Sequence, residues 1–63
     1  MKIKTHTLET EIARQARSYK SIAKEAGITE RTLQHARSGR EIRTATAGRI
    51  AEALGVNVER IIE

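Results

Sequence analysis

Three glycines divide the chain into short segments, and they constrain its fold more than any other feature. Gly27, Gly39 and Gly55 each follow a stretch in which apolar residues recur at helical spacing. Glycine at such a place is typical of a helix C-terminus, because it adopts the left-handed backbone conformation without steric cost. The pattern therefore predicts several short helices that pack together.

The size of the chain limits what it can do. Its 63 residues are enough for one domain, with a small core that leaves no room for a deep enzyme cleft. Cysteine is absent, which excludes a disulfide framework and a thiolate metal site and fits a reducing, intracellular setting. No apolar run is long enough to span a membrane, and Lys2 and Lys4 are not followed by the apolar stretch of a signal peptide.

Five helices are expected, which makes the fold class all-α. The first is predicted over residues 8–16 with Thr7 as its N-cap. Residues 1–6 alternate between polar and apolar, as in a short strand, but we interpret them as a frayed N-terminal arm because a lone strand would have no partner. The remaining helices are predicted over residues 19–26, 30–37, 44–54 and 58–62, so that the folded domain covers residues 7–63. Gly48 lies inside the fourth helix, where a close approach of another helix would explain it.

Positive charge is concentrated in the middle of the chain. The chain has 12 Lys and Arg against 8 Asp and Glu, a net charge of +4. Residues 17–43 carry the whole excess, with basic residues at Arg17, Lys20, Lys24, Arg31, Arg37, Arg40 and Arg43. A basic patch is the electrostatic signature of nucleic-acid binding, although a charge of this size is also common in soluble domains with other functions.

Residues 18–33 join two of the expected helices through a tight turn at Gly27. Ala23 is small where one helix must let the other cross closely, and Ile28 and Leu33 can fill the corner between them. Short helices with this turn and these apolar positions predict a helix-turn-helix.

The chain also resembles a known family, the phage-repressor and Cro superfamily of XRE-type helix-turn-helix domains. The matching residues are Ser18, Ile22, Ala23, Gly27, Ile28, Thr29, Thr32, Leu33, Ser38, Gly39, Arg40, Ile50, Ala51, Ala53, Leu54, Gly55, Val56, Ile61 and Ile62. The resemblance covers residues 8–62. It implies a lambda-repressor-like fold of five short helices that binds double-stranded DNA, with residues 30–37 in the major groove.

The chain departs from the family pattern in three ways. The family often has an acidic residue where this chain has Arg37, paired with a basic residue where it has Ile12. The resemblance therefore implies that the usual buried ion pair is missing and that Arg37 is free for solvent or phosphate. Ala36 replaces a larger apolar residue and implies a slimmer core. Tyr19 replaces a glutamine that reaches phosphate, a contact that the tyrosine hydroxyl can also make.

The resemblance implies two kinds of DNA contact. The residues expected to contact bases are Glu30, Arg31, Thr32, Gln34 and His35. Their groups suit a cytosine amine, a guanine, a thymine methyl, an adenine and a guanine, in that order. The residues expected to contact phosphates, which set the register without reading sequence, are Tyr19, Lys20, Thr29, Ser38, Arg40 and Arg43.

Each of these roles has a structural alternative. Arg31 and Gln34 could be ordinary solvated residues of a helix. The carboxylate of Glu30 would be repelled by phosphates unless it met a cytosine amine. It could instead interact favourably with the helix dipole or pair with Arg31 or Lys24. Arg43 could simply be a charge that flanks the fourth helix.

The expected function is sequence-specific DNA binding, as a transcriptional repressor or a minimal DNA-binding module in the cytoplasm. The alternative is a protein-interaction domain, such as an antitoxin-like binder. A protein-binding helix would show apolar anchors at helical spacing, whereas the exposed face of residues 30–37 is polar, which favours DNA. A natural regulator and a designed or trimmed domain imply the same contacts.

No enzyme activity, cofactor or metal is expected. The sequence shows no catalytic nucleophile–base pair and no Gly-rich phosphate loop, and His35 has only His6 as a potential co-ligand. We also expect no small-molecule ligand and no membrane partner. The chain is expected to be a monomer in solution that forms a weak homodimer on DNA.

Overall fold

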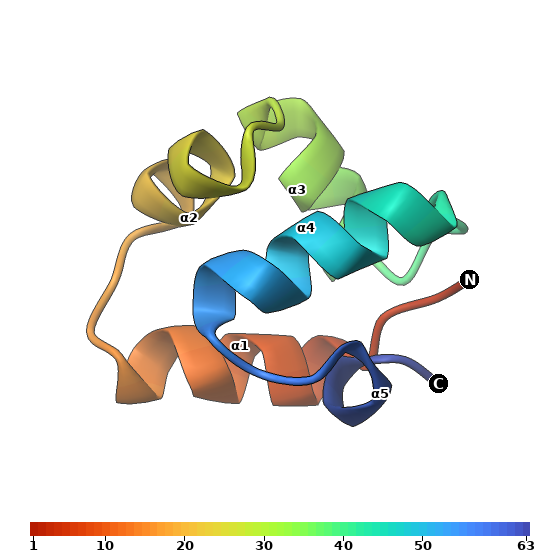
Figure 1. Ribbon diagram of the computed structural model, residues 1–63, viewed down its shortest axis with the longest axis horizontal. Helices are drawn as coiled ribbons and strands as arrows, with labels where there is room; N and C mark the ends of the chain where they lie inside the picture. Colours follow the sequence, from red (N-terminus) through yellow and green to blue (C-terminus); the bar gives the residue numbers. More distant parts are fainter.

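The computed structural model describes residues 1–63 and contains five helices (Figure 1). They are α1 (Thr5–Arg14), α2 (Tyr19–Ala26), α3 (Glu30–Arg37), α4 (Thr44–Leu54) and α5 (Val58–Ile61). In Figure 1, α2 and α3 lie on one side of α4 and α1 lies on the other, with α5 beside the start of α1. The expected all-α fold of five short helices is confirmed. No helix is long and apolar enough to cross a membrane.

The predicted glycine stops are confirmed. The φ angles of Gly27, Gly39 and Gly55 are 73°, 81° and 72°. After each glycine the next amide donates a hydrogen bond back to the last helical turn; that of Ile28, for example, lies 3.0 Å from the carbonyl oxygen of Ala23. These bonds satisfy carbonyls that would otherwise lack partners at the helix ends.

Helix α1 ends in the same way, but around an alanine. Ala16 has a φ of 53° and is the only residue other than glycine with a positive φ. The amide of Arg17 donates to the carbonyl oxygen of Ile12 at 3.2 Å, which closes the same type of end. The predicted bounds of this helix were therefore wrong at both ends. It begins at Thr5, before the predicted N-cap Thr7, and it ends before Ala16, where alanine gives no sequence signal for a stop.

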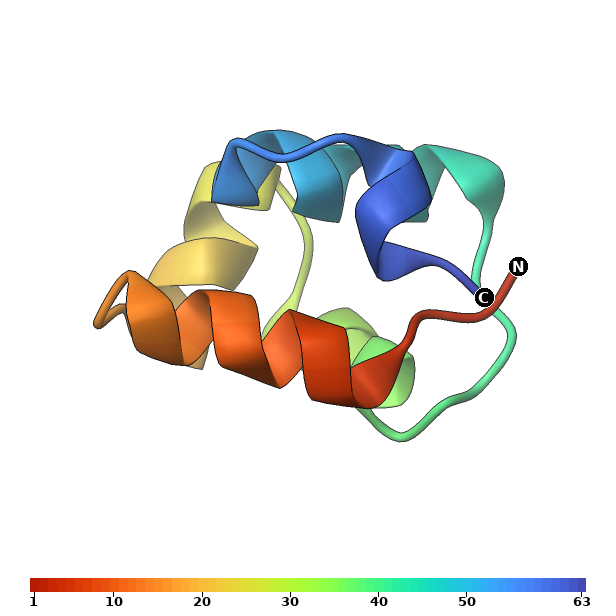
Figure 2. The ribbon, with the colours of Figure 1, turned by 90° about the horizontal axis from the view of Figure 1, so that it is seen from below.

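The N-terminal residues do not form a frayed arm, contrary to our interpretation. Ile3 is fully buried and forms an antiparallel bridge with Ile62. The amide of Lys4 donates to the carbonyl oxygen of Ile61 at 2.7 Å, and that of Glu63 donates to Lys2 at 2.9 Å. The partner that the sequence did not reveal is thus the other end of the chain, and both termini lie side by side in Figures 1 and 2.

Every part of the fold contributes to the core. The largest fully buried side chains are Ile3, Leu8, Ile22, Leu33, Ile50 and Ile61, so the N-terminal segment and each helix supply one. This shared core fixes α3 against the other helices and leaves its opposite face exposed. A close approach of another helix does not explain Gly48, contrary to our suggestion. A Cβ at this position would meet nothing within 4 Å.

Candidate nucleic-acid interface

Two side-chain caps and one turn position α3. Ser18 is the N-cap of α2, and its hydroxyl accepts a hydrogen bond from the amide of Ser21 at 3.1 Å. Thr29 begins α3 and accepts from the amide of Thr32 at 3.1 Å. Between them, Gly27 reverses the chain and Ile28 packs, half-buried, against the core. Because both helices start at fixed residues, the exposed face of α3 has a defined orientation.

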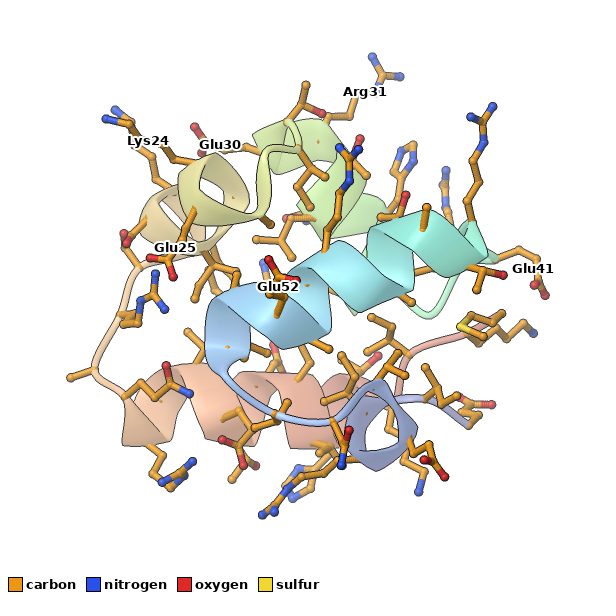
Figure 3. All side chains as sticks on the ribbon, viewed as in Figure 1. Lys24, Glu25, Glu30, Arg31, Glu41 and Glu52 are labelled. Carbon is orange, nitrogen blue, oxygen red and sulfur yellow. The ribbon has the colours of Figure 1, made fainter.

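The exposed face of α3 carries the residues that the sequence analysis expected to contact bases. Glu30, Arg31 and Gln34 are exposed, and Thr32 and His35 are half-buried. Figure 3 shows the side chains of Glu30 and Arg31 extending away from the body of the domain at the start of α3. Glu30 forms no ion pair, so the suggested pairing with Arg31 or Lys24 is not seen.

Lys24 is a surface residue of this region that was not among the residues expected to contact DNA. In Figure 3 it extends from α2 toward the same side as Glu30 and Arg31. Its spacing of four residues from Lys20 was a usable signal, because residues four apart share one face of a helix. Both lysines are exposed and neither forms an ion pair.

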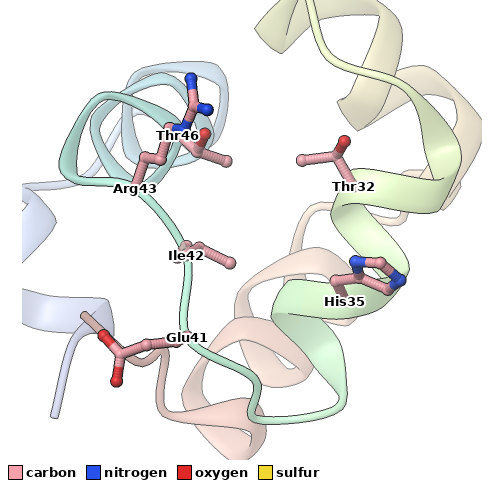
Figure 4. Close-up of a pocket in the computed structure, with 6 residues that line it drawn as sticks. All are labelled: Thr32, His35, Glu41, Ile42, Arg43 and Thr46. Atoms are coloured by element: carbon pink, nitrogen blue, oxygen red, sulfur yellow. The ribbon is translucent and has the colours of Figure 1, made fainter.

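An open groove of about 550 Å³ runs between α3 and the start of α4 (Figure 4). Thr32 and His35 line one side, Arg43 and Thr46 line the other, and Ile42 lies between them. The hydroxyl of Thr32 is 2.9 Å from that of Thr29, while its methyl group points across the groove in Figure 4. The groove therefore offers an apolar methyl, an imidazole and a guanidinium side by side.

The loop before α4 carries further polar and basic groups. Ser38, Arg40 and Arg43 are exposed, and the hydroxyl of Ser38 donates to the carbonyl oxygen of His35 at 2.8 Å. The loop is held from the N-terminal segment, since the amide of Ile42 donates to the carbonyl oxygen of Met1 at 2.8 Å.

Glu41 is the one acid in this loop. The ammonium group of Met1 hydrogen-bonds its carboxylate and lowers the pKa of Glu41. Glu41 also lines the groove, and in Figure 4 its carboxylate points away from Arg43 and Thr46.

The family's usual ion pair is absent, since residue 12 is Ile, but the expectation that Arg37 is free was wrong, because Arg37 pairs with another residue of the first helix. The guanidinium nitrogen Nη2 of Arg37 lies 3.0 Å from a carboxylate oxygen of Glu9 in α1. The pair has the opposite polarity to the one that the resemblance implies, with the acid in α1 and the base in α3. The acid that pairs with Arg37 is Glu9, about one helical turn before Ile12, the position that corresponds to the usual partner in the family.

Tyr19 belongs to the same cluster. Its ring lies under the guanidinium of Arg37, with 3.9 Å between the guanidinium carbon and the ring centroid. Its hydroxyl donates to the carboxylate of Glu9 at 3.3 Å. The hydroxyl proposed to contact phosphate is therefore already bound within the protein.

Arg17 is a second basic residue with a structural role. It donates to the carbonyl oxygen of Ala53 at 2.8 Å, at the end of α4, and pairs with Glu25 at 2.6 Å. Of the seven basic residues in the central window, five remain exposed and without an ion pair: Lys20, Lys24, Arg31, Arg40 and Arg43. No group of three His, Cys, Asp or Glu side chains is placed to hold a metal ion.

The geometry defines the class of the protein: two capped helices joined by a tight turn, the second presenting a polar face, form a helix-turn-helix. A family model described as Helix-turn-helix matches residues 11–61. The chain belongs to this family, whose XRE-type members are DNA-binding domains. No curated protein and no solved structure matches the chain.

Proposed function

We propose that the chain binds double-stranded DNA in a sequence-specific manner, by placing the start of α3 in the major groove, and that it acts as a transcriptional repressor or a minimal DNA-binding module. The observation that carries this proposal is the exposed face of α3, where Glu30, Arg31 and Gln34 are free of apolar neighbours of the kind that a protein partner would bury. A major groove accepts a helix with such a face.

Base contacts come from α3. Arg31 donates two hydrogen bonds to a guanine, Gln34 contacts an adenine, and Glu30 accepts from a cytosine amine. His35 and Thr32 reach bases from the groove beside α3, the imidazole as a donor to guanine and the threonine methyl against a thymine methyl. The threonine methyl group points into the open groove in Figure 4, which supports the last contact. A good two-bond contact is worth about 1–3 kcal/mol of discrimination.

Phosphate contacts come from the residues around α3. Lys20, Thr29, Ser38, Arg40 and Arg43 hold the backbone, and Lys24 joins them because it extends to the same side as Arg31. Tyr19 is left out, since its hydroxyl donates to the carboxylate of Glu9. The hydroxyl of Ser38 must give up its hydrogen bond to the carbonyl oxygen of His35 before it can donate to a phosphate. Four of the phosphate-contacting residues are cations (Lys20, Lys24, Arg40 and Arg43), so the logarithm of the binding constant is expected to fall with the logarithm of salt concentration with a slope of about −4.

A protein-interaction domain is the competing function. No large hydrophobic side chain is exposed anywhere on the domain, which disfavours an apolar docking surface. The same observation supports a monomer in solution that pairs weakly, as a homodimer, when two copies bind adjacent half-sites. The place of action that follows from DNA binding is the nucleoid in the cytoplasm.

The proposal is tested by selecting bound duplexes from a random-sequence pool with the wild type, Arg31→Ala and Arg40→Ala. We expect the wild type to enrich a short motif, Arg31→Ala to lose preference at one position, and Arg40→Ala to keep the motif with weaker binding. A folded wild type that enriches nothing would reject sequence-specific binding and favour the protein-interaction function.

A further inference from the structure

Arg37 connects the exposed face of α3 to the other helices. Its Nη2 pairs with Glu9 at 3.0 Å, and its Nη1 donates to the amide oxygen Oε1 of Gln34 at 3.1 Å. The guanidinium also lies 3.9 Å from the ring centroid of Tyr19, and its Nε is buried. Glu9 and Tyr19 thus hold the planar guanidinium in one orientation, because it is engaged both at its edge and on its face.

This arrangement determines which way the amide of Gln34 faces. The oxygen of the amide accepts from a cation, which is a stronger bond than one between neutral groups. In the flipped amide, the two N–H donors would face the donors of Arg37, which is unfavourable. The NH₂ group of Gln34 is therefore directed away from Arg37, and the side chain is exposed on the face proposed to meet DNA.

We infer that Arg37 is a positioning residue for base recognition, which fixes Gln34 as a hydrogen-bond donor toward the major groove. This inference rests on the proposed function. A donor there selects a base that presents an acceptor, such as the N7 atom of either purine, and disfavours the amine of cytosine. Because Oε1 is already shared with Arg37, the two-bond contact with adenine loses part of its advantage, so Gln34 favours any base with an acceptor, a purine through N7 or thymine through O4, over cytosine.

Arg37→Lys is the informative variant. Lysine keeps the positive charge and can still pair with Glu9, but it is a compact charge without the planar fork that reaches both partners. The amide of Gln34 is then free to flip and can present its oxygen to a cytosine amine. Since the net charge is unchanged, a change in base preference cannot come from altered attraction to phosphate.

The experiment measures binding to duplexes that vary at one position, namely the position at which Gln34→Ala loses base preference. We expect Arg37→Lys to lower the ratio of purine to cytosine affinity there by about threefold or more, with the ratios at other positions unchanged. In the Gln34→Ala background, Arg37→Lys should change nothing further at that position. In NMR spectra of the free protein, the chemical shifts of the side-chain NH₂ group of Gln34 should differ from those of a flexible glutamine in the wild type. In Arg37→Lys they should move toward the values of a flexible glutamine.

The opposite result is a uniform loss. If Arg37→Lys weakens binding to all duplexes in equal proportion and leaves the base profile intact, Arg37 has only a structural role and the inference is rejected. Should Arg37→Lys fail to fold, Glu9→Gln loosens Arg37 without changing the shape of its partner, and it must give the same change in base profile. A wild type without base preference at any position would reject the proposed function itself, which separates the two failures.

Discussion

Ala16 shows how a single residue escapes prediction. Three of the four helix ends that close on a left-handed residue do so at glycine, and all three were predicted from glycine alone. Ala16 adopts the same conformation with a φ of 53°, where its Cβ is crowded by the backbone. Such helix ends can be predicted from the sequence only when the residue type itself indicates a stop, as glycine does. Alanine does not, because it is the strongest helix former.

Ala16→Gly should stabilise the protein. Glycine removes the Cβ strain of about 1–2 kcal/mol, and its greater freedom in the unfolded chain offsets about half of that gain. We expect an increase in the free energy of unfolding of about 0.5–1 kcal/mol, measured by urea denaturation. Gly27→Val is the converse control, because it places a β-branched side chain at a φ of 73° and should destabilise the fold. A loss of stability in Ala16→Gly would contradict the strain assigned to Ala16.

At the scale of elements, two buried or half-buried charge clusters tie α1 to its neighbours. Glu9 meets Arg37 of α3, and Thr5 at the start of α1 donates to the carbonyl oxygen of Arg37 at 2.8 Å. Glu11 is buried and pairs with Arg14 at 2.6 Å and with Arg60 of α5 at 3.4 Å. The number and order of the helices could be predicted because their signals are local in sequence, although the N-cap predicted at Thr7 was wrong. The partners of Glu9 and Glu11 could not, because they depend on how the helices pack.

Glu11 makes stability depend on pH. The hydrogen bond from Arg14 lowers the pKa of Glu11 below its usual value of 4.5, with a further contribution from Arg60. A lowered pKa in the folded state means that the unfolded chain takes up the proton first, so this stabilisation is present above about pH 4.5 and is lost as the pH falls further. The free energy of unfolding of Glu11→Gln should therefore fall less steeply than that of the wild type below this pH.

Thermal unfolding at a series of pH values measures this effect. Glu59→Gln, at an exposed residue of α5 without an ion pair, is the matched control and should retain the acid dependence of the wild type. Equal acid dependence in Glu11→Gln and the wild type would show that the contacts of Glu11 do not contribute.

At the scale of the whole molecule, the pairing of the two chain ends could not be predicted from the sequence. Ile3 and Ile62 pair across nearly the full length of the chain, and no local pattern encodes a contact of that separation. The contacts extend to the loop before α4, because the backbone of Met1 bonds to that of Ile42. The N-terminal segment thus supports both the core and the loop that carries Arg40 and Arg43.

Ile3→Ala should therefore be strongly destabilising. A fully buried isoleucine shortened to alanine costs about 2–5 kcal/mol, a large part of the stability of so small a domain. Circular dichroism during thermal unfolding should show a marked decrease in midpoint temperature, whereas Lys2→Ala, at an exposed residue of the same segment, should change it little. A near-native midpoint for Ile3→Ala would mean that the N-terminal segment is frayed after all.

In the candidate site too, the features with local sequence signals could be predicted, and those that depend on tertiary packing could not. The sequence was sufficient to predict the helix-turn-helix and the exposed face of α3, since caps, turn and apolar spacing are all local. The engagement of Tyr19 and Arg37 within the protein depended on tertiary packing and was missed. The base contacts proposed for α3 depend on a docking angle that the sequence does not encode, and they stay predictions.

The most direct test of the central claim is the ratio of affinities for a selected duplex and a scrambled duplex of equal composition, measured for the wild type, Arg31→Ala and Arg40→Ala across a range of salt concentrations. We predict that Arg31→Ala lowers this ratio by about five- to 150-fold, the equivalent of about 1–3 kcal/mol. Arg40→Ala should leave the ratio unchanged and reduce the salt slope by about 1. Recognition of sequence by α3 would be contradicted if both variants bound the two duplexes more weakly in equal proportion, so that the affinity ratio stayed at the wild-type value.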